Sequence, residues 1–187
     1  RSCDYCGSQS FESLWNYKHF SPTTNGTFIW KINNVLCKKC GFIFVSPIPT
    51  SNSLEKYYQS LHSIFTNQNI DYSISKRLKI IKKYSKKRTS YLEIGGNKTN
   101  EFYVEVKKIF KKTYLVEVNN DHTGPYKGIN DFKNIQFNVI TAYFVLEHLN
   151  NPYRFLCDCS MRLDDKGILI IEVPNVRDYD KKSDGLM

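Results

Sequence analysis

Residues 91–99 read Tyr-Leu-Glu-Ile-Gly-Gly-Asn-Lys-Thr, and they decide how the larger part of the chain folds. A short apolar run that breaks abruptly into two glycines is typical of a strand that enters a tight turn. Apolar residues then recur at helical spacing from residue 102 to residue 110. Asn100 is suited to the start of that helix, and Lys111 and Lys112 are suited to its end. The sequence therefore predicts a strand, a glycine loop and a helix in succession.

A second apolar run, residues 114–118, carries an acidic residue, Glu117, close to its end. Glycines let the backbone approach a ligand, and the N-terminus of the following helix offers N–H groups to it. An acidic residue about 20 positions beyond such glycines can bind the hydroxyls of a ribose. The combination favours a site for a nucleoside-type ligand, and an ordinary turn after a strand is the alternative.

The rest of this region alternates between strand and helix patterns. Residues 137–141 read as a buried strand, and Asn151 caps a helix that begins with Pro152. A turn at residues 165–167 leads to a strand at 168–173. A weaker strand signal covers residues 126–129. Because strands alternate with helices, we predict a parallel α/β sheet.

Two CxxC pairs lie in the N-terminal part, Cys3 with Cys6 and Cys37 with Cys40, and a glycine follows each pair. Four thiolates in two such pairs suit a tetrahedral Zn²⁺ ion, and the glycine allows the tight turn in which N–H groups point at sulfur. A redox CxxC motif is the competing interpretation, but its duplication favours a metal. Because four protein sulfurs would leave no open coordination position, we expect a structural zinc rather than a catalytic one.

Apolar residues between the cysteine pairs suggest short strands at 28–36, with Asn25 and Gly26 as a hairpin turn. Residues 41–45 read as a further strand that prolines stop, and residues after 50 look partly helical. We therefore predict a zinc-binding lobe at 1–50, a helical linker at 51–70 and a larger α/β domain at 71–187.

The net charge of +9 fits a nucleic acid, an acidic substrate or an anionic surface as partner. Eight basic residues and no acidic one lie between residues 76 and 88, while Ile74, Leu78, Ile81 and Ser85 keep helical spacing. This pattern predicts an amphipathic helix with a solvated lysine face. A nucleic-acid surface is less favoured, because aromatic residues are not interleaved with the basic ones.

No run approaches the roughly 18 continuous apolar residues of a membrane span, so we expect a soluble protein without a membrane partner. Paired cysteines of the metal-binding type favour a reducing compartment, which makes the cytoplasm the expected location. Because residue 1 is arginine and the sequence ends in a polar run, we also expect a part of a longer protein.

Three stretches resemble class I S-adenosylmethionine-dependent methyltransferases, namely Phe137-Asn-Val-Ile, Val145-Leu-Glu-His-Leu and Ile171-Glu-Val-Pro-Asn. The segment Cys40-Gly-Phe-Ile-Phe-Val-Ser-Pro-Ile-Pro49 is similar to a subgroup with an N-terminal zinc-binding region, found in sugar C-methyltransferases. The resemblance implies a Rossmann-like sheet, S-adenosylmethionine as cofactor, and a small-molecule acceptor such as a nucleotide-linked sugar.

The resemblance also implies the residues of the site. Those that would bind the cofactor are Glu93, Gly95, Gly96, Asn97, Glu117 at the ribose, Asp131 on the adenine side, and Tyr143. Glu147 and His148 would form the catalytic pair, with one of them as general base. The family usually has glycine where this chain has Asn97 and Thr99. Asn tolerates left-handed backbone angles but a branched Thr does not, so this departure affects cofactor affinity.

Two other functions fit the sequence. A zinc-ribbon protein that binds RNA, or an RNA methyltransferase, would use the basic helix and the net charge of +9. An inactive methyltransferase-like paralogue would account for the altered glycine motif.

Overall fold

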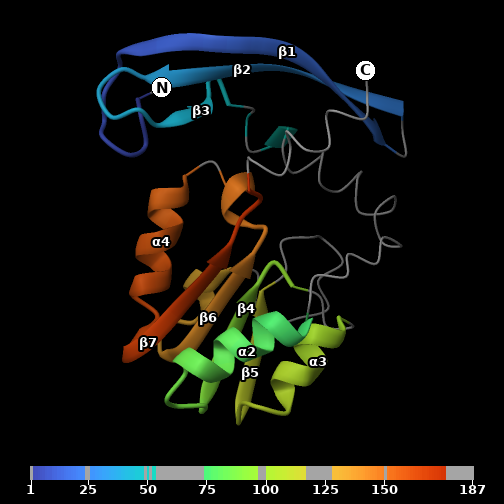
Figure 1. The fold of residues 1–187 in the computed structure, drawn as a ribbon, viewed down its shortest axis with the longest axis vertical. Helices are drawn as coiled ribbons and strands as arrows, with labels where there is room; N and C mark the ends of the chain where they lie inside the picture. The colour runs from blue at the N-terminus through green and yellow to red at the C-terminus, as the bar shows by residue number, and fades with distance from the viewer. Residues whose placement is uncertain are drawn as a thin grey trace. The chain divides into compact units, whose positions relative to one another are not determined.

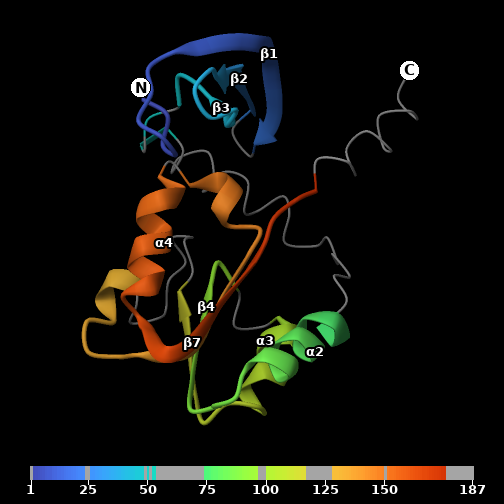
Figure 2. The ribbon, with the colours of Figure 1, turned by 60° about the vertical axis from the view of Figure 1, so that its left-hand side comes forward.

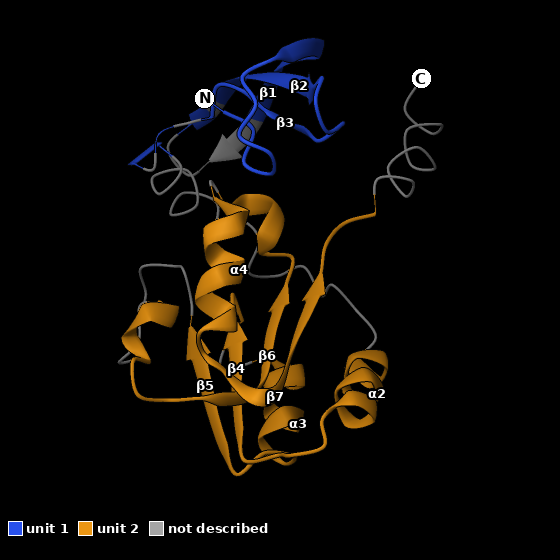
Figure 3. Ribbon diagram, turned by 90° about the vertical axis from the view of Figure 1, so that its left-hand side faces the viewer, with its two compact units in different colours: residues 1–70 blue, residues 71–187 orange. Residues whose placement is uncertain are grey.

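The computed structural model describes residues 2–23, 26–48, 50, 52–53, 74–96, 100–116, 128–149 and 151–175. The chain divides into two compact units, Arg1–Ile70 and Asp71–Met187, which Figure 3 shows in different colours. The predicted helical linker lies almost wholly outside the described residues.

The N-terminal unit is a three-stranded antiparallel sheet in the order β1-β2-β3 (Figure 1). Its strands are β1 (Phe11–Thr23), β2 (Gly26–Cys37) and β3 (Ile43–Val45). β1 and β2 pair along nearly their whole lengths, from Phe11 opposite Cys37 to Thr23 opposite Gly26. The expectation of short strands was therefore wrong, because aromatic residues continue the strand pattern through β1 as well. The expected turn residue Asn25 lies outside the described residues.

The larger unit is a parallel four-stranded sheet covered by helices on both faces. Its strands, in the order β5-β4-β6-β7, are β4 (Ser90–Ile94), β5 (Lys112–Val116), β6 (Phe137–Tyr143) and β7 (Leu163–Glu172). Helices α2 (Ile74–Tyr84) and α3 (Glu101–Lys107) cover one face, and α4 (Pro152–Ser160) covers the other (Figure 2). The predicted parallel α/β sheet is confirmed. Within the described residues, no helix is long and apolar enough to cross a membrane.

Alternate side chains of β4 supply the two halves of the core. Leu92 packs on the face covered by α4, in one cluster with Phe155 and Cys159. Tyr91 packs on the opposite face, in one cluster with Ile81 of α2 and neighbouring apolar residues of α3. Because successive side chains of a strand point to opposite faces, this uninterrupted buried strand can only lie at the centre of a two-sided sheet.

The helix after the glycine loop begins where the sequence predicts but ends earlier. The Asn100 side chain accepts a hydrogen bond from the N–H of Phe102 and caps α3. α3 stops at Lys107, because Phe110 turns into the core and packs beside Tyr91, with ring centroids 5.1 Å apart. Lys112, expected near the helix end, instead opens β5.

Two further expectations need correction. Residues 128–131 do not form a strand, since Ile129–Asp131 is a 3₁₀ helix that begins after Gly128. The strand predicted at 168–173 starts earlier as β7, pairing first as Leu163 with Phe137 and then as Ile168 with Val139. The predicted turn at 165–167 lies within this irregularity. The cap at Asn151 is confirmed, since its side chain accepts from the N–H of Arg154.

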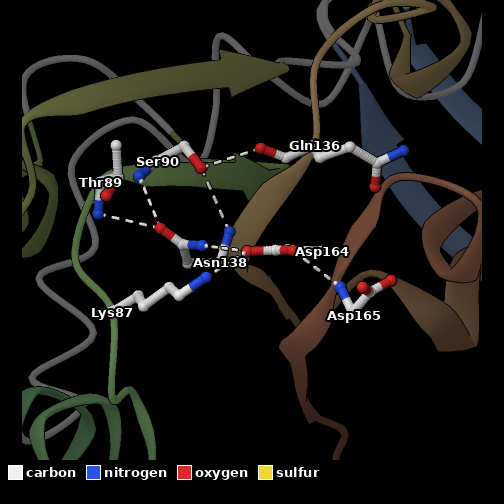
Figure 4. A network of polar contacts seen from close by, with 7 residues as sticks. All are labelled: Lys87, Thr89, Ser90, Gln136, Asn138, Asp164 and Asp165. Atoms are coloured by element: carbon white, nitrogen blue, oxygen red, sulfur yellow. Dashed lines mark hydrogen bonds and ion pairs between the residues drawn. The ribbon is translucent and has the colours of Figure 1, made fainter.

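A buried asparagine joins three strands at the amino ends of the sheet (Figure 4). Oδ1 of Asn138 accepts from the backbone N–H groups of Thr89, at 2.9 Å, and Ser90, at 3.1 Å. Its Nδ2 donates to Asp164 at 3.0 Å, and Lys87 lies 3.5 Å from the same carboxylate. Because Asn138 and Ser90 are both buried, this side chain supplies a hydrogen-bond partner that water cannot readily replace at the start of β4.

Replacing Asn138 by alanine is expected to lower the free energy of unfolding by about 2 kcal/mol, because two N–H groups at the start of β4 lose their acceptor. Urea denaturation measures this loss. Asn134→Ala, at an exposed position of the same unit, is the matched control and should change stability by less than about 0.5 kcal/mol. Equal stability of the two variants would contradict the assigned role of the network.

Candidate functional site

The two cysteine pairs, far apart in the sequence, meet in the N-terminal unit. The four sulfur atoms, of Cys3, Cys6, Cys37 and Cys40, all lie within 4.8 Å of one another, and none of them forms a disulfide. Cys3 and Cys37 are buried. Cys37 ends β2 opposite Phe11, so the pairing of the hairpin brings the second cysteine pair beside the first.

The two cysteine loops have the same backbone geometry. Gly7 donates its N–H to the carbonyl of Cys3 at 2.8 Å, and Gly41 donates to that of Cys37 at 2.9 Å. Both glycines are left-handed, with φ of 72° and 76°, which explains the residue type after each pair. In the second loop the N–H of Cys40 also donates to the sulfur of Cys37. Such donors stabilise thiolates.

The sulfur positions fit a tetrahedral metal ion. The Cys3 and Cys40 sulfurs are 3.7 Å apart, and those of Cys6 and Cys37 are 3.6 Å apart. Four sulfurs at about 2.3 Å from Zn²⁺ lie about 3.8 Å from one another. The four thiols are free, and their spacing is compatible with a tetrahedral site of four sulfur ligands.

The second candidate site lies at the carboxyl edge of the parallel sheet, where the glycine loop leaves β4. Gly95 has a left-handed φ of 76°, and its N–H donates to the carbonyl of Val116 at the end of β5. A Cβ atom at Gly95 would lie 2.5 Å from Cγ2 of Val145. One at Gly96 would lie 2.3 Å from Oε1 of Glu93. Gly95 is therefore required by its backbone angle and by close packing, whereas a side chain at Gly96 would displace the Glu93 carboxylate.

Glu93 is a buried carboxylic acid directly below this loop. Burial raises its pKa from 4.5 to about 7, against the opposing effects of a hydrogen bond from Tyr91 and the charge of Arg77. The Tyr91 hydroxyl also lies 2.6 Å from that of Thr141 on β6. Because the folded state keeps the Glu93 proton above pH 4.5, this group lowers stability as the pH rises toward 7.

Arg77 of α2 joins this cluster, contrary to the expectation that it belongs to the solvated lysine face. Its Nε donates to Oε2 of Glu172 at 2.8 Å, and its side chain is only 12% exposed. Its guanidinium lies 4.0 Å from the ring centroid of Tyr143. Glu172 and Tyr143 are partners on neighbouring strands, so Arg77 fixes α2 to the carboxyl edge at β6 and β7.

Tyr143 ends β6 and presents a buried hydroxyl that has no hydrogen-bond partner among the described residues. Burial raises the pKa of this hydroxyl well above its ordinary value, so it is a proton donor at neutral pH. The next residue, Phe144, has a left-handed φ of 56°, which is strained for a bulky side chain. This turn directs the following Val145 onto Gly95.

Glu147 and His148 follow in a short 3₁₀ helix, Leu146–His148, beyond the carboxyl end of β6. His148 Nε2 lies 3.9 Å from Glu147 Oε1, which is too long for a direct hydrogen bond. The His148 side chain is 51% exposed and that of Glu147 is 25% exposed. Both side chains are therefore accessible at the edge that holds the glycine loop.

Three predicted cofactor-binding residues remain, namely Asn97, Glu117 and Asp131. Asn97 and Glu117 lie outside the described residues. The carboxylate of Asp131 accepts a hydrogen bond from the N–H of Gly128, at the start of its own 3₁₀ helix.

Sequence reasoning did not assign Arg77, Tyr91, Thr141 or Glu172 to the site. Only Arg77 gave a signal that could have been used. It stands three residues after Ile74 and four before Ile81, which is the spacing of the buried face of its helix.

Residues 66–186 match a family model described as a methyltransferase domain. This match covers more than half of the chain, and the chain belongs to the methyltransferase domain family. The Rossmann-like methyltransferase fold expected from the sequence is thereby confirmed.

The crystal structure of Streptomyces venezuelae DesVI is similar to 68% of this chain, with 14% sequence identity and a TM-score of 0.41. The similar part spans 59% of that protein's chain. No curated protein matches this chain significantly.

Proposed function

We propose that this chain transfers a methyl group from S-adenosylmethionine to a small-molecule acceptor. The observation that carries the proposal is the tightly packed pair Gly95–Gly96 above Glu93, in a chain that belongs to the methyltransferase domain family. Ligands of open α/β sheets bind outside the carboxyl ends of the strands, which is where this loop and residues 143–148 lie. The cysteine-rich segment that resembles sugar C-methyltransferases favours an acceptor such as a nucleotide-linked sugar.

The residues at this edge suit the cofactor. The buried Tyr143 hydroxyl has no described partner and can donate to a ligand atom. Gly95 and Gly96 let the backbone approach a ligand closely, and Glu117 follows the end of β5, where it would bind the ribose hydroxyls. S-adenosylmethionine supplies an electrophilic methyl group on a sulfonium, so this chain has to orient the acceptor, exclude water and remove a proton. We assign the proton transfer to Glu147 and His148.

We further propose a structural zinc ion on Cys3, Cys6, Cys37 and Cys40. Its role is to fold the N-terminal unit, because four sulfur ligands leave no position for a substrate. Zinc bound by thiolates is compatible with a reducing compartment, and we place the protein in the cytoplasm on that ground.

Isothermal calorimetry with S-adenosylhomocysteine tests the cofactor site on the full chain. Glu117→Ala should weaken binding about tenfold, because two ribose hydroxyls would lose a charged acceptor, worth about 1.5 kcal/mol. Asp165→Ala removes an exposed acid at the amino edge of the sheet and should leave the affinity unchanged. Equal affinity of all three proteins would remove Glu117 from the site. Absence of binding to every one of them would favour an inactive paralogue.

A further inference from the structure

Exposed basic residues from two segments make up a basic surface of the larger unit. It consists of the exposed basic residues at 76–88, which exclude Arg77, together with the exposed lysines at 107–112. The two segments are distant in the sequence, but the N–H of Lys111 donates to the carbonyl of Arg88 at 3.1 Å. The N–H of Lys112 donates likewise to Thr89. Figure 1 also shows α2 and α3 side by side, so the two basic segments lie on one side of the larger unit.

The lysines of α2 are arranged in a row. Lys76, Lys79 and Lys83 are exposed and separated by three and four residues, so they project from the same side of the helix over about 10 Å. Like charges at this spacing destabilise a helix by a few tenths of a kcal/mol per pair. Among the described residues, Asp164 beside Lys87 and Glu105 beside Lys108 offset part of this charge at the margins of the surface. The surface thus retains repulsion that a bound polyanion would relieve.

We propose that this basic surface binds the phosphate backbone of a single-stranded nucleic acid. A membrane-binding surface would need a row of apolar side chains beside the charges, and a protein interface would need an apolar centre. In the described parts of α2 and α3, large exposed apolar side chains are limited to Tyr84 and Val104. Lysines without an apolar centre suit phosphate contacts, which are independent of sequence.

Tyr84 fits the same partner. It is 55% exposed, and the ammonium of Lys83 lies 5.0 Å from its ring centroid. An exposed ring beside lysines offers one stacking position to a base. The sequence does not show aromatic residues interleaved with the basic ones. The structure is consistent with this, because it places a single exposed ring, that of Tyr84, beside the lysines of α2.

The proposal is independent of the methyl-transfer site. Arg88, Lys111 and Lys112 lie at the amino ends of β4 and β5, whereas the glycine loop leaves the carboxyl end of β4. A nucleic acid on this surface therefore leaves the cofactor edge accessible, whether the methyl acceptor is a small molecule or another group.

The test is fluorescence anisotropy of the full chain with a labelled 20-nucleotide oligouridylate and the corresponding oligothymidylate, titrated between 50 and 200 mM salt. We expect Lys79→Glu/Lys83→Glu to weaken binding at least tenfold at 100 mM salt and to reduce the salt slope, because each lost phosphate contact lowers that slope by about 0.7. Lys18→Glu/Lys31→Glu, on exposed and paired positions of the hairpin, changes the net charge equally and should bind like the wild type. Lys79→Ala/Lys83→Ala repeats the test without new acidic groups, and thermal melting verifies that each variant is folded.

The proposal is overturned if the wild type binds neither oligonucleotide at 50 mM salt, or if binding does not depend on salt. Equal losses in the two Lys→Glu pairs would show an effect of net charge alone. Binding to vesicles of 30% phosphatidylserine but to neither oligonucleotide would assign the surface to a membrane instead.

Discussion

Replacing Cys37 by serine is expected to unfold the N-terminal unit and release its zinc. Among the described residues of this unit the core is small, since the buried apolar residues form one cluster with Cys3, Val35, Cys37 and Phe44, in which two of the four members are proposed ligands. Zinc binding in small four-ligand domains contributes about 10–16 kcal/mol of apparent free energy at neutral pH. This exceeds what so small a core can supply, so the unit should depend on its metal.

The two tryptophans make this prediction measurable in the intact chain. Trp15 on β1 and Trp30 on β2 are the only tryptophans in the sequence, and both belong to the N-terminal unit. Trp15 is already 52% exposed, so the emission of the partly buried Trp30 should account for a red shift in Cys37→Ser, and in the wild type after a strong chelator. The wild type should contain about one zinc per chain by metal analysis.

Cys157→Ser in α4 is the matched control, because it removes a thiol outside the cluster. It should keep both the zinc and the tryptophan emission. A metal-dependent fold would be excluded if the wild type kept its tryptophan emission after its metal was removed. It would also be excluded if Cys37→Ser had the same emission as the wild type.

The sequence predicted those parts of the fold that local chemistry determines. β4 and its glycine loop follow from an apolar run that ends at glycines, and the caps at Asn100 and Asn151 follow from side chains that accept backbone N–H groups. The end of α3 depends instead on the packing of Phe110 against Tyr91. A pattern within the helix sequence cannot predict this contact, because Tyr91 lies on β4. Tertiary packing decided the helix boundary there.

The same distinction applies to the candidate sites. The four cysteines were predicted together because metal ligands occur in short, regular spacings. The Arg77 cluster was not predicted, since it joins α2 to strands that lie almost a hundred residues further along the chain. A charge in a lysine-rich run suggests solvent exposure, and only the spacing of the buried face distinguishes Arg77 from its neighbours.

Replacing either member of the pair Glu147 and His148 should lower turnover, with a loss of about a hundredfold for the general base. Three features of the structure support the proposed position of the pair near the reacting atoms. Both residues lie beyond the carboxyl end of β6, both side chains are accessible, and Val145, just before them, packs on Gly95 of the glycine loop. At 3.9 Å the two groups can come into hydrogen-bonding distance through a small rotation, and an acceptor proton can be shared between them.

The measurement compares the full chain with Glu147→Gln and His148→Asn, which keep size and polarity but remove the base. Methyl transfer to the acceptor is followed together with the affinity for S-adenosylhomocysteine, which should be unchanged in both variants. Leu149→Ala, adjacent to the pair and packed on the core, is the control for local disruption. If Glu147→Gln and His148→Asn turn over as fast as the wild type, the pair has a structural role and the proton leaves by another route.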